Sequence, residues 1–169
     1  MSEIVNRVAQ SSIVSVNLEE GYPREERVLF DLKPFLFQEL VLREKDFRAQ
    51  LKEQDWSTFE GKWVAVTCSV DAIIPTWAYM LVGTYLENVA SGYVLGDLSD
   101  LENHIAKIHV SKFDVESVRD RPVVIKGCSE LPIPLYAYGS LLSLVQNHAK
   151  SIMYGEPCST VPLFKKPKS

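Results

Sequence analysis

The sequence predicts an α/β protein with a mostly parallel sheet, and two patterns carry this prediction. From Gly61 onward, short apolar runs of strand length alternate with longer segments of helical length. Pro75 and Pro134 each open one of the helical segments, where a proline loses no hydrogen bond. Because strands that alternate with helices pair in parallel, we expect one domain over residues 1–169. Its central sheet would have a flavodoxin-like or Rossmann-like order and be flanked by helices.

The first part of this domain, residues 1–60, has a different pattern. Ser12–Leu18 alternates apolar and polar residues, and Arg27–Leu32 is a second strand candidate. Gly21 and Pro23 lie between them, so we predict a turn that joins an N-terminal antiparallel strand pair. A short helix at 34–40 and a charged surface helix at 44–54 are expected to follow.

The predicted α/β core covers residues 61–162 and is followed by a basic tail at 163–169. Its strands are expected at 62–67, 92–96, 122–126 and 151–154, and its helices at 75–90, 97–109 and 134–150. In a flavodoxin-like order the second of these strands lies at the sheet edge, followed by the first, the third and the fourth. The first, third and fourth strands would then be neighbours.

All three cysteines of the chain follow strands of this predicted core, and a serine follows each of them. The pairs are Cys68-Ser69, Cys128-Ser129 and Cys158-Ser159. The first two pairs belong to an internal repeat, in which Ile-Pro-Thr-Trp-Ala-Tyr from Ile74 matches Ile-Pro-Leu-Tyr-Ala-Tyr from Ile133. The repeat indicates that one strand–turn–helix unit is built twice.

The three thiols are predicted to form a shared metal or iron–sulfur site. The carboxyl ends of neighbouring parallel strands meet at one edge of a sheet, so Cys68, Cys128 and Cys158 would lie there together. Three thiolates suit zinc, or a [4Fe–4S] cluster with one iron left open. The residues expected to support this cofactor are Ser69, Ser129, Ser159 and Asp97. The candidate fourth ligands are Asp71, Asp97, Glu130 and Glu156.

Two other interpretations of the cysteines stay open. They can be inert, buried thiols of a non-enzymatic interaction or scaffold protein, because free cysteine often fills space in a core. One of them can instead be the nucleophile of a thiol enzyme. The sequence therefore does not decide whether the protein is an enzyme. His104, His109 and His148 fall in predicted helices and are weaker ligand candidates.

Composition and charge argue against several partner classes. The formal net charge of -4 provides no basic face for nucleic acid. The longest apolar stretch, Ala72–Val82, is short and contains Pro75, so no membrane span is expected. The N-terminus shows no secretory signal, and an odd number of cysteines is poor material for disulfides. We therefore expect a cytoplasmic protein.

Several segments carry a family resemblance. They are CSVDAIIPTWAYML from Cys68, VVIKGCS from Val123, KSIMYGEPCSTVP from Lys150 and EIVNRVAQS from Glu3. Together they resemble an uncharacterised bacterial family, domain of unknown function 2480, over nearly the whole chain. The family brings no established activity to this sequence. The resemblance implies partners among iron–sulfur assembly or sulfur-mobilisation proteins.

Overall fold

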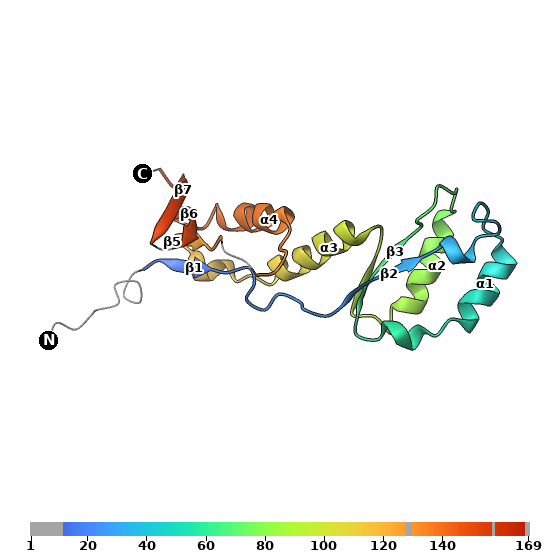
Figure 1. Cartoon of the computed structure of the whole chain (residues 1–169). Helices are drawn as coiled ribbons and strands as arrows, with labels where there is room; N and C mark the ends of the chain where they lie inside the picture. Colours follow the sequence, from blue (N-terminus) through green and yellow to red (C-terminus); the bar gives the residue numbers. More distant parts are fainter. Residues whose placement is uncertain (1–11, 128–129, 157, 168–169) are drawn as a thin grey trace. The chain divides into compact units, whose positions relative to one another are not determined.

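The computed structural model describes residues 12–127, 130–156 and 158–167 (Figure 1). The chain divides into two compact units. Unit 1 consists of Met1–Pro23 and Ile105–Ser169, and unit 2 consists of Arg24–His104. Unit 2 is therefore one continuous stretch that lies, in the sequence, inside unit 1. No helix within the described ranges is long and apolar enough to cross a membrane.

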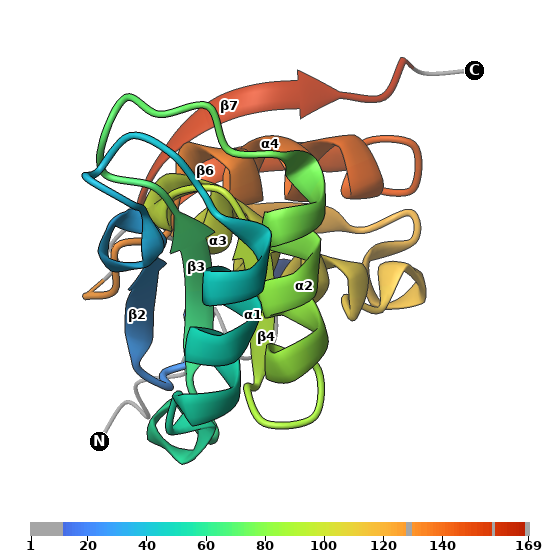
Figure 2. The ribbon, with the colours of Figure 1, turned by 90° about the vertical axis from the view of Figure 1, so that its right-hand side faces the viewer.

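Unit 2 contains a three-stranded parallel sheet with two helices on one face. Its strands β2 (Arg27–Asp31), β3 (Trp63–Thr67) and β4 (Gly92–Leu95) lie in the order β2-β3-β4. Between β2 and β3 come the 3-10 turn η1 (Lys33–Phe35), helix α1 (Glu44–Glu53) and the 3-10 turn η2 (Trp56–Phe59), and α2 (Thr76–Leu86) joins β3 to β4. Figure 2 shows α1 and α2 in front of the sheet.

The helices of unit 2 follow from where their apolar residues lie. Phe47 and Leu51, one turn apart on α1, are fully buried, whereas the other residues of this helix are exposed. Helix α2 begins directly after Pro75 and buries one side against Val64 and Val66 of β3. The two ends of unit 2 are linked by an ion pair, in which Arg27 Nε lies 2.7 Å from Glu102 Oε1.

A stack of aromatic rings fills the space between β2 and the helices of unit 2. Phe30 of β2 stacks on Phe35 and on Trp56, with ring centroids 5.3 and 5.4 Å apart and interplanar angles of 19° and 12°. Trp56 stacks in turn on Tyr85 at 4.7 Å and 11°. Phe59 tilts against Phe30 at 5.7 Å. Because aromatic side chains bury large areas, this stack is a major part of the core of unit 2.

Among the described residues, unit 1 repeats the succession of elements of unit 2 apart from η1, and it has one strand more. Strands β1 (Val14–Val16), β5 (Pro122–Ile125) and β6 (Ser151–Glu156) are parallel in the order β1-β5-β6, and β7 (Ser159–Lys165) adds to β6 in the antiparallel direction. The end of helix α3 (Leu98–Ser111) and the 3-10 turn η3 (Val115–Val118) precede β5, and α4 (Leu135–Val145) joins β5 to β6.

Strand register shows that the two units are built on one plan. Val28 of β2 lies opposite Val64 of β3 in unit 2, and Val14 of β1 lies opposite Val123 of β5 in unit 1. Where these first strands end, the side chains of Asp31 and Asn17 each accept a hydrogen bond of 3.0 Å from the backbone N–H two residues further on.

The turns before the central strands, β3 and β5, agree as well. Asp55 and Asp114 cap η2 and η3, each accepting a bond of 3.0 Å from the N–H two residues further on. Gly61 and Asp120 then adopt positive φ angles of 67° and 54° before β3 and β5. The same offset in the sequence relates each residue of α2 (Thr76–Leu86) to one residue of α4 (Leu135–Val145). The repeat seen in the sequence is therefore part of a longer one.

The α/β class and the mostly parallel sheet are confirmed, but the neighbours of the central strands differ from the predicted order. β4 pairs with β3 and β6 pairs with β5, as a flavodoxin-like order requires. β3 does not pair with β5, because β2 lies beside β3 and β1 lies beside β5. The predicted antiparallel pair of 12–18 with 27–32 is therefore wrong, since each of these strands runs parallel to a central strand in a different sheet. The predicted tail begins inside β7, which extends to Lys165.

Candidate functional site

The structure places two of the three predicted thiol ligands. Cys68 follows β3 in unit 2, where it is half-buried and its Sγ donates a hydrogen bond of 3.5 Å to the Val70 carbonyl. Cys158 is exposed in the turn between β6 and β7 of unit 1. Cys128 lies outside the described residues.

The predicted three-thiolate metal or iron–sulfur site is wrong. Among the described residues, no group of three or more His, Cys, Asp or Glu side chains could hold a metal ion. The physical reason is the strand pairing. β3 belongs to one sheet and β6 to another, so Cys68 and Cys158 do not follow neighbouring strands. Nor are these two cysteines inert buried thiols, because one is half-buried and the other exposed.

The predicted supporting residues have local structural roles or stay undescribed. Asp97 accepts a bond of 2.9 Å from the Asp100 N–H, and Asp100 accepts one of 3.0 Å from the Asp97 N–H, which caps the start of α3. Ser159 is the exposed first residue of β7. Ser129 lies outside the described residues.

Ser69 contributes to a clamp at the carboxyl edge of unit 2. One oxygen of Asp31 accepts bonds of 3.0 Å from the Ser69 and Lys33 N–H groups, and the other accepts the Ser69 hydroxyl at 2.5 Å. Burial opposes ionisation of Asp31, but the bonds from Ser69 and Lys33 outweigh it and lower the pKa of this carboxyl. Burial raises the pKa of Tyr79, and the nearby Cys68 and Asp31 raise it further. Because both Asp31 oxygens are engaged, the clamp holds the loop after β3.

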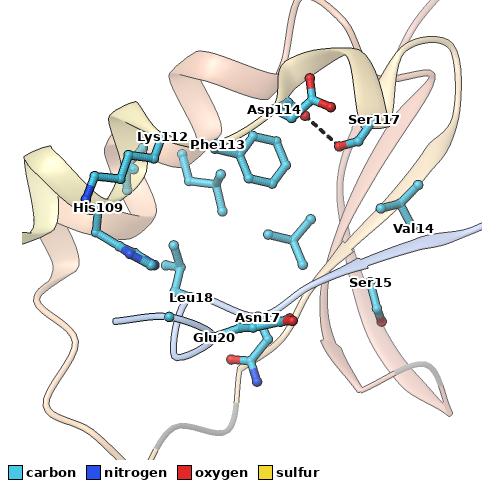
Figure 3. Close-up of a pocket in the computed structure, with 14 residues that line it drawn as sticks. Val14, Ser15, Asn17, Leu18, Glu20, His109, Lys112, Phe113, Asp114 and Ser117 are labelled. Carbon is cyan, nitrogen blue, oxygen red and sulfur yellow. Dashed lines mark hydrogen bonds between the residues drawn. The ribbon is translucent and has the colours of Figure 1, made fainter. Parts of the chain in front are cut away.

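A cavity lies in unit 1, between β1 and the end of α3 (Figure 3). Its volume is about 450 Å³. Its walls come from β1 and the turn after it, from the end of α3, from η3 with the residues before it, and from Leu141 of α4. Apolar side chains from β1 and α3, with Phe113 and Leu141, supply much of the wall, and polar groups stand among them. We treat this pocket as the candidate functional site.

The polar groups of the pocket are held in place by the turns that carry them. The Asn17 side chain accepts the Glu19 N–H at 3.0 Å, and the Asp114 side chain accepts the Glu116 N–H at 3.0 Å. The Ser117 hydroxyl donates to the Asp114 carbonyl at 2.5 Å (Figure 3). These groups are therefore presented by ordered backbone and not by loose side chains.

His109 lies at one side of the pocket, near Leu18 (Figure 3). Burial lowers the pKa of its imidazole, against a hydrogen bond to the Leu18 backbone that raises it, and Lys112 lowers the pKa further. Tyr22, which is buried, packs edge-on against the imidazole with ring centroids 5.1 Å apart. Burial therefore favours the uncharged form of the His109 imidazole.

The pocket exists because unit 1 has small residues where unit 2 has rings. Val16 occupies the position of Phe30 in the shared plan, and Gly21 occupies that of Phe35. Gly21 has a φ of 71°, which favours glycine, so no ring projects from this position. Both residues line the cavity.

The sequence marks His109 only as a weak metal-ligand candidate, because a position within a helix gives no sign of a pocket. A usable signal was present upstream of the Cys-Ser pairs. If the repeat is extended toward the N-terminus, Trp56 and Phe59 align with Val115 and Val118. The loss of bulky aromatic residues from one copy of a repeat predicts a gap in its core.

The comparisons with known proteins identify a family. Residues 2–166 match the family described as Protein of unknown function (DUF2480). The chain belongs to this family. No curated protein and no solved structure matches the chain. Membership of the DUF2480 family therefore confirms the resemblance seen in the sequence, and the functional argument rests on the pocket.

Proposed function

We propose that this DUF2480 protein binds a small molecule in the pocket of unit 1. The observation that carries the proposal is a cavity of about 450 Å³ in which apolar and polar side chains, His109 among them, line one space. Small-molecule sites are typically apolar cavities of roughly 300–1,000 Å³ with a few fixed polar groups. The pocket meets both conditions.

The polar groups indicate which kind of ligand atom would bind. A neutral imidazole has one donor and one acceptor nitrogen. His109 lines the pocket, so its acceptor nitrogen is available to a ligand O–H or N–H there. The body of the ligand would lie against Val16, Phe113 and Leu141. The proposed ligand is therefore partly apolar and carries a hydroxyl or amino group.

The proposal also covers the source, the cellular compartment and the partners of this protein. The family resemblance and the odd number of cysteines favour a bacterial, cytoplasmic protein. The iron–sulfur assembly or sulfur-mobilisation partners that the resemblance implies stay a prediction.

Fragment screening by NMR tests the proposal. We expect neutral fragments with one hydroxyl or amino group to shift the amide signals of Val16, Gly21 and Val110. The matched control is His109→Gln, because Gln50 occupies this position in unit 2. Its binding should be at least fivefold weaker while its spectrum stays folded. If no fragment at millimolar concentration shifts these signals, the proposal is wrong.

A further inference from the structure

The stack of rings in unit 2 shows what the shared plan accommodates beside its first strand. Phe35, Phe30, Trp56 and Tyr85 form successive pairs whose interplanar angles do not exceed 19°. The space between β2 and the covering helices is therefore filled by flat groups that lie nearly parallel. Stacked rings contribute about 0.5–1.5 kcal/mol per pair beyond the area that they bury.

Unit 1 keeps the backbone plan but lacks every ring of that stack. The counterparts of Phe35, Phe30, Trp56 and Tyr85 are Gly21, Val16, Val115 and Leu144. The elements of unit 1 have not closed over the missing rings, because a cavity of about 450 Å³ remains beside Val16 and Gly21. Open space thus lies where unit 2 places the rings of Phe30 and Phe35.

Aromatic groups of unit 1 also border this space. The side chain of Phe113 points into the pocket, and His109 lies across from it near Leu18 (Figure 3). Phe113 has no ring at its counterpart, which is Gln54. A flat guest could therefore stack on Phe113 while it lies against the aliphatic side chains of Val16 and Leu141.

We infer that the ligand of this pocket is a planar aromatic compound of one or two rings. This inference rests on the function proposed above and narrows it to a ligand class. The ligand takes the place of rings that unit 2 carries on its own side chains. A hydroxyl or amino substituent of the ring system would reach the acceptor nitrogen of His109.

Two probes with the same carbon skeleton and hydroxyl group test the inference, namely 2-naphthol and decahydro-2-naphthol. The full chain is titrated with each, and binding is followed by NMR. We expect 2-naphthol to bind at least tenfold more tightly. Its ring current should also move the methyl signals of Val16 and Leu141. The variant Phe113→Leu should narrow the difference between the probes to less than threefold while its spectrum stays folded.

The outcomes separate this inference from the broader proposal. If decahydro-2-naphthol binds as tightly as 2-naphthol, the pocket binds small molecules and the aromatic inference is wrong. The same holds if only non-aromatic fragments shift the signals of Val16 and Gly21. If neither probe and no fragment shifts them, both the inference and the proposed function are wrong.

Discussion

Unit 2 and unit 1 have the same strand order and the same turns, yet one is filled where the other is hollow. Beside the first strand, unit 2 packs Phe30 against Phe35, Trp56 and Phe59. Unit 1 has Val16 at the corresponding position, next to a cavity of about 450 Å³. Phe30 and Phe35 of unit 2 thus correspond to Val16 and Gly21 of unit 1, and both of these residues line the cavity. The comparison shows that rings fill the core beside β2, whereas a cavity lies beside β1.

The largest expected effect on stability comes from removing a ring from the core of unit 2. Phe30→Ala should lower the free energy of unfolding by about 3–5 kcal/mol, because it removes a buried ring and leaves a cavity. Val16→Ala should cost about 1 kcal/mol, because its side chain already borders open space. Urea unfolding measures both. Tryptophan fluorescence reports unit 2, which holds Trp56, Trp63 and Trp77, and amide exchange at Val123 reports unit 1. Equal losses would contradict the contrast between the units.

A larger side chain that fills the cavity of unit 1 should raise the free energy of unfolding. Val16→Phe restores the side chain that unit 2 has at this position, so we expect a gain of about 1 kcal/mol in the stability of unit 1. The same change should abolish binding of 2-naphthol. Val161→Phe on β7, outside the pocket, is the control and should alter neither quantity. Unchanged 2-naphthol binding by Val16→Phe would place the ligand elsewhere.

Features that the two units share should have equal energetic value. Asp55→Ala and Asp114→Ala each remove a side-chain cap before the central strand, and each should cost about 1 kcal/mol. Fluorescence and amide exchange in urea again separate the units. A cost of more than 2 kcal/mol for one cap and none for the other would show that the common plan does not extend to the turns.

The smallest expected effect is a pH dependence confined to unit 1. Burial holds the pKa of His109 below its ordinary value, so the unfolded chain binds the proton more readily. His109 therefore contributes stability above a pH of about 6.5, and this contribution is lost as the pH falls through its lower pKa in the folded state. The variant His109→Gln should show a smaller loss of stability between pH 8 and pH 5. If His109→Gln loses as much stability over this range as the parent protein, the assignment is refuted.

Much of the fold was predictable because its signals are local. The starts of α2 and α4 were marked by Pro75 and Pro134, and the pairs β3–β4 and β5–β6 follow from short connections through one helix. The partners of β1 and β2 were not predictable. Their pairing with β5 and β3 depends on contacts between distant residues, and apolar alternation gives no partner.

The candidate site was less predictable than the fold. Two of the Cys-Ser pairs lie beside the repeat, but a thiol site also requires the strands to be neighbours, and β3 and β5 are not. The pocket depends on what is missing from unit 1. Such an absence becomes visible only when Val16 and Phe30 are known to correspond, and strand register supplies that correspondence.

The insertion of unit 2 between β1 and the rest of unit 1 has a consequence for how the chain folds during synthesis. During synthesis, all of unit 2 leaves the ribosome before β5 does. Strand β1 is therefore still unpaired when unit 2 is complete, because its partner β5 lies in the second half of the chain. If the segment between β1 and β5 were still unfolded, pairing these two strands would require closing a long loop, which would slow folding. The ion pair between Arg27 and Glu102 holds the two ends of folded unit 2 together. Once folded, unit 2 therefore acts as a short spacer, and β1 can reach β5 as if few residues lay between them.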